Sequence, residues 1–248
     1  MSTLLAVDTL TRRFGGLVAV NAVSLDLRRG EVHAVIGTNG AGKSTLINML
    51  SGEISASDGR ITLDGEDITR RAQFRRALAG VGRSYQRTTI FPEFTVLENC
   101  RLAAQAATPR PWAIWQSSRH CADSNAAARE SLSAAGLDTV ADRIAGTLSH
   151  GAKRQLEVAM CLATNPRVLL LDEPLAGMGA EETERMLALL TRLKDSHAIL
   201  LVEHDMDAVF RIADRITVMV NGTVIATGDP ASIRTNPEVR TAYLGEDH

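Results

Sequence analysis

Glycines, a lysine and hydroxyl groups crowd into one nine-residue segment, and this combination suits phosphate binding. Glycine lets the backbone take positive φ and approach a bound group without a Cβ clash. The amides of such a turn, with the positive end of a following helix, attract phosphate oxygens. Lys43 can then reach the β- and γ-phosphates, and the Ser44 hydroxyl can bind Mg²⁺. We therefore predict a site for a nucleoside triphosphate, built from Gly37, Asn39, Gly40, Ala41, Gly42, Lys43, Ser44 and Thr45.

Two carboxylates and a histidine mark the ends of two other apolar segments. Asp172 and Glu173 follow the run 168–171, and His204 lies just beyond the run 198–202. Carboxylates at the end of a buried strand are costly unless positive charge lies nearby, and Mg²⁺ on a nucleotide would supply that charge. In that arrangement Asp172 holds the ion, Glu173 orients or deprotonates an attacking water, and His204 contacts the γ-phosphate. Taken singly, Glu173 is equally well explained as a helix-start carboxylate, and His204 as a surface histidine.

The elements that must position these groups follow from hydrophobic periodicity and turn residues. Strands are expected at 4–10, 18–27, 31–36, 59–63, 81–85, 168–171, 198–202, 216–220 and 224–227. Helices are expected at 46–50, 95–107, 126–135, 152–163, 181–194 and 206–212, with helical turns at 230–234 and 237–244. Because a strand precedes the glycine-rich turn and a helix follows it, a chance match is a poor explanation of the turn.

These elements predict one α/β domain. An antiparallel sheet in the first third of the chain surrounds the strand, turn and helix of the phosphate site. The continuous apolar runs 168–171 and 198–202 suit strands buried on both faces of a parallel sheet. A helical insert is expected between roughly residues 87 and 164. The pair Asn221–Gly222 between two short strands predicts a hairpin.

Composition limits the class of protein. The 248 residues are 45% hydrophobic and 23% charged, which is enough for one sizeable core. A formal net charge of −2 gives no basic field for nucleic acid. Cys100, Cys121 and Cys161 lack metal-ligand spacing and predict reduced thiols in the cytoplasm. The sequence shows no signal peptide and no apolar run of about 18 residues, so we expect a partner to provide any attachment to a membrane.

Two other features have open roles. Four arginines between residues 70 and 76 predict the solvated face of a short helix. Trp112 and Trp115 lie in a proline-containing loop, where contact with a partner and local packing are both reasonable expectations.

The order of the motifs resembles that of the ATP-binding subunits of ABC transporters. The matching motifs are the glycine-rich loop, Gln86, the signature loop Leu148–Ala152, Asp172 with Glu173, and His204. The resemblance covers essentially the whole chain. It implies a P-loop ATPase core with an antiparallel β-subdomain and an inserted helical subdomain. Phe14 falls where an aromatic ring stacks on adenine, and residues 176–179 match the loop that contacts the opposite subunit.

The resemblance also assigns roles at the phosphates. Ser149 and Gly151 would face the γ-phosphate of a nucleotide that the opposite subunit holds. Gln86 would sense the γ-phosphate, act beside the catalytic groups, and meet the membrane subunit. The residues implied as Mg²⁺ ligands are Ser44, Gln86 and Asp172.

The implied mechanism is ATP hydrolysis coupled to solute movement. Two such chains, or this chain and a paralogue, would sandwich two ATP molecules. Lys43, His204 and Mg²⁺ would offset developing charge while Glu173 positions the water. Closing and reopening of the dimer would move integral membrane permease subunits at the cleft beside Gln86. The chain would lie in the cytoplasm, on the inner face of the cell membrane, with a substrate-binding protein involved only indirectly and no nucleic acid.

Segments in the last fifth of the chain resemble one branch of the family. Residues 203–206, 213–218 and 239–246 are similar to one of the two ATPases of branched-chain amino acid importers. The ATPases of urea and short-amide importers are close alternatives, and His150 and Met178 fit there too. A lipid or lipopolysaccharide exporter ATPase is a further alternative. A soluble ABC protein of DNA repair or translation is disfavoured, because such chains carry coiled-coil inserts or two fused ATPase units, for which 248 residues leave no room.

Two positions depart from the family pattern. Ala152 stands where the signature loop usually ends in glutamine, so Ser149 lacks the reciprocal half of a capping box. Gly179 occupies a place often held by aspartate or asparagine, which weakens the expected signal to Glu173 across the dimer. Because of Ala152, we expect the isolated chain to dimerise weakly and to hydrolyse ATP slowly.

Overall fold

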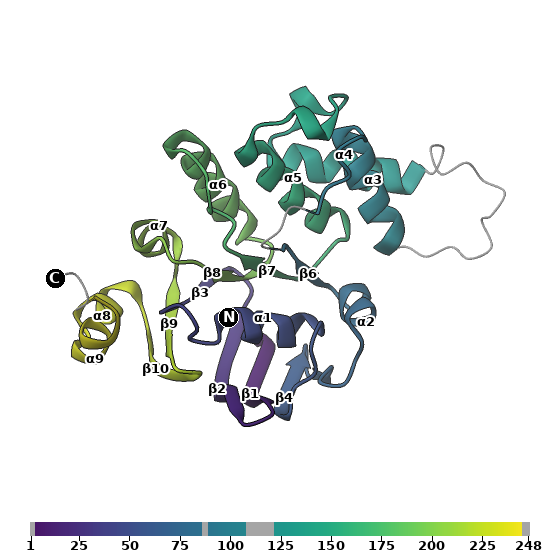
Figure 1. The fold of residues 1–248 in the computed structure, drawn as a ribbon. Coiled ribbons are helices and arrows are strands. Elements are labelled where there is room, and N and C mark those ends of the chain that lie inside the picture. Colours follow the sequence, from purple (N-terminus) through teal and green to yellow (C-terminus); the bar gives the residue numbers. More distant parts are fainter. Residues whose placement is uncertain (1–2, 86–88, 108–121, 245–248) are drawn as a thin grey trace.

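The computed structural model describes residues 3–85, 89–107 and 122–244, so Gln86, Trp112, Trp115 and Cys121 lie outside the described residues. Two sheets make up the framework, and helix α1 (Lys43–Ser51) lies between them (Figure 1). Apolar residues of α1 pack against both sheets in one core cluster. The mixed α/β class expected from the sequence is confirmed.

The larger sheet has six strands in the order β10-β9-β3-β8-β7-β6. Their bounds are β3 (Glu31–Gly37), β6 (Val81–Arg83), β7 (Val168–Asp172), β8 (Ala198–Val202), β9 (Arg215–Val220) and β10 (Thr223–Gly228). The five strands β9, β3, β8, β7 and β6 each run parallel to the next one in this order, whereas β9 and β10 form the predicted antiparallel hairpin. Every residue of β3, β7 and β8 is buried, because apolar clusters cover both faces of these strands.

The smaller sheet is antiparallel and has the order β2-β1-β4-β5. Its strands are β1 (Thr3–Phe14), β2 (Leu17–Arg28), β4 (Asp58–Leu63) and β5 (Glu66–Asp67). The first two strands extend past the predicted ranges because their pairing continues to Thr3 with Arg28 at one end and Phe14 with Leu17 at the other. In the larger sheet, strand β6 is shorter than predicted and ends at Arg83 rather than at Tyr85.

Helices cover the outer face of the larger sheet. Helices α3 (Val96–Ala107), α4 (Ala122–Ala135) and α5 (His150–Ala163) gather on one side of the molecule, and α6 (Ala180–Leu193) and α7 (Met206–Ile212) follow along the sheet (Figure 1). One apolar core joins these helices to β7 and β8. The shorter elements are α2 (Gln73–Leu78), α8 (Pro230–Thr235), α9 (Pro237–Val239) and single turns at Asp138–Val140, Ala145–Thr147 and Arg240–Leu244. Within the described ranges, no helix is long and apolar enough to cross a membrane.

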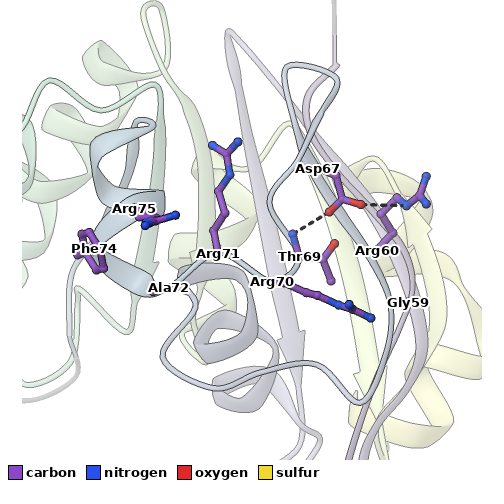
Figure 2. Close-up of a pocket in the computed structure, with 9 residues that line it drawn as sticks. All are labelled: Gly59, Arg60, Asp67, Thr69, Arg70, Arg71, Ala72, Phe74 and Arg75. Carbon is purple, nitrogen blue, oxygen red and sulfur yellow. Dashed lines mark hydrogen bonds and ion pairs between the residues drawn. The ribbon is translucent and has the colours of Figure 1, made fainter.

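The arginines near α2 divide between core and surface. Arg76 is only 2% exposed, so the prediction of a solvated face is wrong for this residue. Its guanidinium donates to the carbonyls of Met49 and Leu50 in the last turn of α1, where the carbonyls lack a full set of intrahelical donors. The other three arginines of the run and Arg60 surround a hollow of about 780 Å³ (Figure 2).

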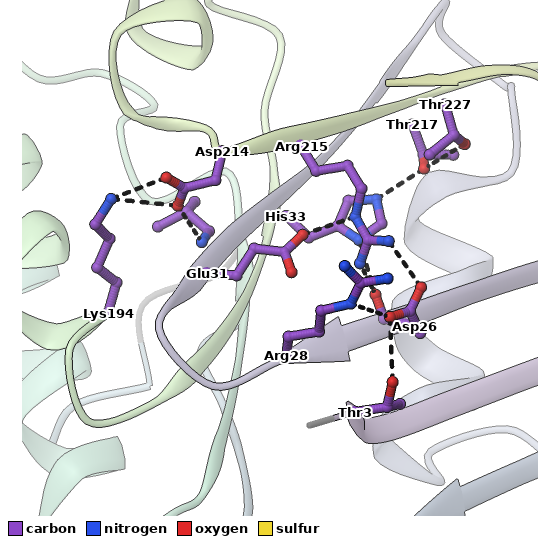
Figure 3. Close-up of polar contacts among 11 residues, drawn as sticks. Thr3, Asp26, Arg28, Glu31, His33, Lys194, Asp214, Arg215, Thr217 and Thr227 are labelled. Atoms are coloured by element: carbon purple, nitrogen blue, oxygen red, sulfur yellow. Dashed lines mark hydrogen bonds and ion pairs between the residues drawn. The ribbon is translucent and has the colours of Figure 1, made fainter. Parts of the chain in front are cut away.

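A polar network joins the two sheets beside β3. Arg215 of β9 donates to Asp26 of β2 and to Glu31 of β3, both at 2.7 Å (Figure 3). Although burial opposes it, hydrogen bonds from Arg215 and Arg28 lower the pKa of Asp26 to about 2. The network fixes β3, whose carboxyl end leads directly into the glycine-rich loop.

Candidate functional site

The predicted site residues follow the carboxyl ends of neighbouring parallel strands. In the sheet register, Val202 at the end of β8 pairs with Asp172 on one side and with Val35 of β3 on the other. The glycine-rich loop follows β3, Glu173 follows β7, and His204 follows β8. Parallel strands end at the same edge of a sheet, where α/β proteins bind their ligands. The fold therefore brings these segments together although they are far apart in the sequence.

The glycine-rich loop has a backbone that side chains would disrupt. Gly37 has φ +154°, and a Cβ there would lie 2.1 Å from the Met219 carbonyl oxygen. Gly42 has φ +96°, and a Cβ there would lie 2.4 Å from the Ala19 carbonyl oxygen. Gly40 also has positive φ, but nothing lies within 4 Å of its Cβ position. The loop is thus pinned at two points and open in the middle, where a phosphate can approach the amides.

Lys43 begins α1 and folds back over the loop. Its Nζ donates to the Gly37 carbonyl oxygen at 2.6 Å and to the Thr38 carbonyl oxygen at 3.0 Å. Burial lowers the pKa of the ammonium, and the nearby carboxylates of Glu173 and Asp172 oppose that shift. An ammonium has three donors, so Lys43 can also reach a phosphate oxygen in the loop.

Asp172 is a buried carboxylate with an unsatisfied oxygen. The residue is 3% exposed, and its Oδ1 has no hydrogen-bond partner among the described residues. Burial raises the pKa of this carboxyl group, and the charge of Arg83 opposes the shift. Arg83 Nη2 lies 3.8 Å from Asp172 Oδ2, too far for a hydrogen bond. A buried oxygen without a donor suits a metal ligand, because a divalent cation would satisfy it. The exposed Ser44 hydroxyl is a second oxygen of the kind Mg²⁺ prefers.

Glu173 has an unusual backbone that the strand beside it holds. Its φ is +49°, a conformation that costs free energy for a residue other than glycine and that clusters at functional sites. Its N–H donates to the Val202 carbonyl oxygen at 2.9 Å. The next helix starts only at Ala180, so the helix-start explanation is wrong. Glu173 Oε1 lies 3.8 Å from His204 Nδ1, and both side chains reach solvent, so a water molecule can approach them.

Glu203 is a site residue that the sequence reasoning missed. It is fully buried, and burial raises the pKa of its carboxyl group. Its Oε1 accepts from the Leu175 N–H at 2.8 Å and its Oε2 accepts from the His204 N–H at 3.2 Å. Glu203 therefore ties the turn after Glu173 to the segment that carries His204. The signal in the sequence was the one used for Asp172, an acidic residue that ends an apolar run.

Ser149 and Gly151 lie apart from the glycine-rich loop. No hydrogen bond among the described residues joins them to residues 37–45. Ser149 is the N-cap of α5, and its Oγ accepts from the Ala152 N–H at 3.2 Å. Both residues instead donate to Glu182 of α6. Among the described residues, the signature loop and the glycine-rich loop are therefore not hydrogen-bonded to each other, as expected if each is one half-site that a second subunit completes.

Gln86 lies outside the described residues, but α5 holds both of its flanks. Arg154 Nη1 donates to the Tyr85 carbonyl oxygen at 3.0 Å, and the Thr89 N–H donates to Glu157 Oε1 at 2.9 Å. Arg154 and Glu157 also bond each other at 2.9 Å. This buried pair was not anticipated, because nothing in its local sequence separates it from surface charges of an amphipathic helix.

Two further predicted positions are open to solvent. Phe14 ends β1, is 44% exposed, and has the Arg12 guanidinium 4.4 Å from its ring centroid. Its role at adenine stays a prediction. Gly179 precedes α6 with φ −75°, and nothing lies within 4 Å of its Cβ position, so the fold does not require glycine there.

Comparisons with known proteins agree with this architecture. The ABC transporter family matches residues 20–176, and the family described as branched-chain amino acid ATP-binding cassette transporter matches residues 223–248. The chain is 41% identical to the high-affinity branched-chain amino acid transport ATP-binding protein BraF of Pseudomonas aeruginosa, with 98% of each chain covered. It is 43% identical to LivG of Salmonella typhimurium, which has the same description, again with 98% of each chain covered.

Solved structures show the same fold. A nucleotide-free ATP-binding cassette from an ABC transporter superposes with a TM-score of 0.88 at 30% identity, covering 99% of this chain and 100% of the other. The ADP conformation of an ATP-binding cassette of an ABC transporter superposes with a TM-score of 0.86 at 29% identity, with the same coverage.

Proposed function

The chain belongs to the ATP-binding proteins of ABC transporters, and from this premise we propose that its ATP hydrolysis powers the import of branched-chain or related amino acids. The high identity to BraF and LivG over the whole chain supports this solute class over urea or short amides and over lipid export. The match of residues 223–248 to the branched-chain family supports it independently.

The observation that carries the catalytic proposal is that Glu173 directly follows Asp172, the buried residue with an unsatisfied oxygen that ends β7. Glu173 Oε1 would accept a proton from the attacking water, or orient it, while Lys43 would contact the β- and γ-phosphates. His204, 3.8 Å from Glu173 Oε1, would contact the γ-phosphate on the same side. Mg²⁺ would neutralise charge on the phosphate oxygens, held by Asp172 and Ser44, with Gln86 as the third predicted ligand.

The two half-sites favour a dimer as the working unit. Ser149 and Gly151 form no hydrogen bond with the glycine-rich loop of their own chain within the described residues, so a second subunit would have to complete each site. That subunit is a second copy or a paralogue. Tethering two such chains to one membrane core would raise their effective concentration to about millimolar.

A cleft beside the flanks of Gln86 is the proposed contact for the permease subunits. A cavity of about 230 Å³ lies among α2, β6, α3 and α5, and both Tyr85 and Thr89 line it. The movement of α5 on dimer closure would be transmitted to a permease at this cleft. Helix α5 begins at the signature loop, and its residues Arg154 and Glu157 hydrogen-bond to Tyr85 and Thr89, which line the cleft. The chain would then work from the cytoplasm at the inner face of the membrane, and a substrate-binding protein would act only through the permeases.

Catalysis is tested by Glu173→Gln, with Glu184→Gln as the matched control. Glu184 is an exposed glutamate of α6 that pairs with Arg211, so the control makes the same charge change on the surface. We expect Glu173→Gln to bind ATP normally, to slow ATP turnover about 10²- to 10⁴-fold, and to accumulate as an ATP-bound dimer in size-exclusion chromatography. Turnover at the wild-type rate in Glu173→Gln would remove Glu173 from the mechanism.

The solute is tested in proteoliposomes that contain this chain, its co-purified permease subunits and the binding protein. Radiolabelled leucine, urea and a lipid substrate are compared with ATP inside the vesicles. Uptake of leucine alone is the expected result. Uptake of urea, or failure of any permease to co-purify, would contradict the proposed function.

A further inference from the structure

One carboxylate oxygen of the chain itself occupies the two donors of the signature loop. The Ser149 hydroxyl donates to Glu182 Oε1 at 2.8 Å, and the Gly151 N–H donates to the same oxygen at 3.2 Å. The other oxygen, Oε2, lies 3.4 Å from the Gly179 N–H. Glu182 belongs to the first turn of α6, whereas Ser149 and Gly151 begin α5, so the contact bridges two helices.

The packing at Gly151 shows how closely this carboxylate approaches. A Cβ on Gly151 would lie 2.3 Å from the carboxyl carbon of Glu182 and 2.7 Å from its Cβ and Cγ. The Glu182 side chain thus fills the space directly in front of the Gly151 amide. The hydrogen bond from Ser149 lowers the pKa of Glu182, so at neutral pH the group in this space is an anion.

The same two donors have another acceptor in the proposed function, on which this inference rests. There, the Ser149 hydroxyl and the Gly151 amide face the γ-phosphate of a nucleotide that the second subunit holds. Each of them has a single hydrogen to donate. A phosphate oxygen and Glu182 Oε1 cannot both accept from this pair at full strength, and two anions in one place repel each other.

We propose that Glu182 is an inhibitory residue for ATP-driven dimer closure, because its carboxylate occupies the γ-phosphate position of the signature loop until a γ-phosphate displaces it. The γ-phosphate of ATP carries more negative charge than a carboxylate, so it displaces Glu182 as the acceptor of the two hydrogen bonds. ADP has no phosphate at that position, so the carboxylate stays and closure adds no hydrogen bond between the signature loop and the nucleotide. Glu182 thereby raises the concentration of ATP that closes the dimer and leaves the response to ADP unchanged.

The effect of removing the charge follows from this exchange. In Glu182→Gln the amide oxygen accepts more weakly than a carboxylate, since charge-assisted hydrogen bonds are about twice as strong as neutral ones. The γ-phosphate then displaces a weaker acceptor when the dimer closes. We expect about tenfold less ATP analogue for half-maximal dimerisation, which corresponds to about 1.4 kcal/mol, and a response to ADP like that of wild type.

The experiment measures dimerisation by sedimentation velocity during titration with AMP-PNP, which resists hydrolysis, and with ADP, each with Mg²⁺. Four proteins are compared: wild type, Glu182→Gln, Glu182→Asp and Glu181→Gln. The aspartate variant keeps the charge but withdraws the carboxylate from Ser149, and it should close as easily as the glutamine variant. Glu181 is the neighbouring glutamate, 87% exposed and paired with Arg185, so its variant is the matched control and should titrate like wild type.

Three results would overturn the proposal. The first is an AMP-PNP midpoint that does not change in either Glu182 variant, or one that changes no more than the ADP response does. The second is loss of the AMP-PNP dimer in folded Glu182 variants with a wild-type melting temperature, since Glu182 would then support the loop rather than compete for it. The third is a wild type that binds a fluorescent ATP analogue as a monomer and never dimerises, which would remove the proposed dimer itself and this exchange with it.

Discussion

His33 lies in the middle of β3 and links the strand to the polar network that joins the two sheets (Figure 3). The side chain is 1% exposed. Its Nδ1 lies 3.0 Å from the Asp26 carbonyl oxygen, which can only accept, so Nδ1 carries the hydrogen. Its Nε2, 2.8 Å from Thr217 Oγ1, therefore accepts from that hydroxyl. Every polar atom of the neutral ring is satisfied. A second ring proton would point at the threonine oxygen and add charge beside Arg215.

Acidification should therefore destabilise the fold through His33. Burial, together with the charge of Arg215, lowers the pKa of His33 from 6.5 to about 4. Between these values the unfolded chain binds this proton and the folded chain does not, so stability is full above the higher pKa and falls as the pH drops. The loss from roughly pH 7.5 to pH 5 is about 2 kcal/mol, and below the folded pKa it reaches about 3 kcal/mol.

The assay is urea unfolding of wild type and His33→Gln at both pH values. The glutamine variant has its own fixed cost, because its amide cannot reproduce both ring hydrogen bonds, but that cost does not titrate. The free energy of unfolding of wild type minus that of His33→Gln should decrease by about 2 kcal/mol between roughly pH 7.5 and pH 5. The groups whose pKa values burial moves toward this pH range contribute equally to both proteins and cancel in the difference, and they include Glu31, Glu157, Asp172, His197 and Glu203.

A matched control is His197→Gln, a half-buried histidine whose pKa is also lowered by burial. It should change the pH dependence in the same direction but by less. A free-energy difference between wild type and His33→Gln that is the same at both pH values would refute the assignment of a neutral, buried His33.

Lys43→Ala should abolish ATP binding in equilibrium titration, because it removes the cation that is proposed to contact the β- and γ-phosphates; unchanged affinity would mean that the glycine-rich loop is not the site. Ala152→Gln should strengthen the dimer of the lone chain by roughly 0.5–1.5 kcal/mol by restoring one polar contact. A wild-type ATPase activity that is high and independent of dilution would contradict weak dimerisation. Glu157→Ala should lower the free energy of unfolding in urea by about 3 kcal/mol, because the buried Arg154 charge loses the carboxylate that pairs with it. The double variant Arg154→Met, Glu157→Leu should recover most of that loss, because it leaves no buried charge at the two positions.

The sequence by itself determined the glycine-rich loop, the strand ends and the fold class. Gly37 and Gly42 were recognised from their spacing in the motif alone, although the tertiary structure adds a second reason for glycine, because carbonyl oxygens of the distant residues Met219 and Ala19 lie against them. The apolar runs 168–171 and 198–202 likewise predicted fully buried parallel strands, and each is confirmed. Positive φ at Glu173 had no local signal, because the neighbouring strand holds that backbone rather than its own side chain.

Contacts between distant segments were decided only by the tertiary structure. Glu182 was one acidic residue among several at the start of a helix, and nothing near it in the sequence indicated that it would reach Ser149. Arg76 belonged to a charged run that predicted exposure to solvent, yet its guanidinium donates to two carbonyls in the last turn of α1. A residue's type fixes which hydrogen bonds it can make. Which partner it meets depends on how helices and strands pack, and that is set by the apolar core as a whole.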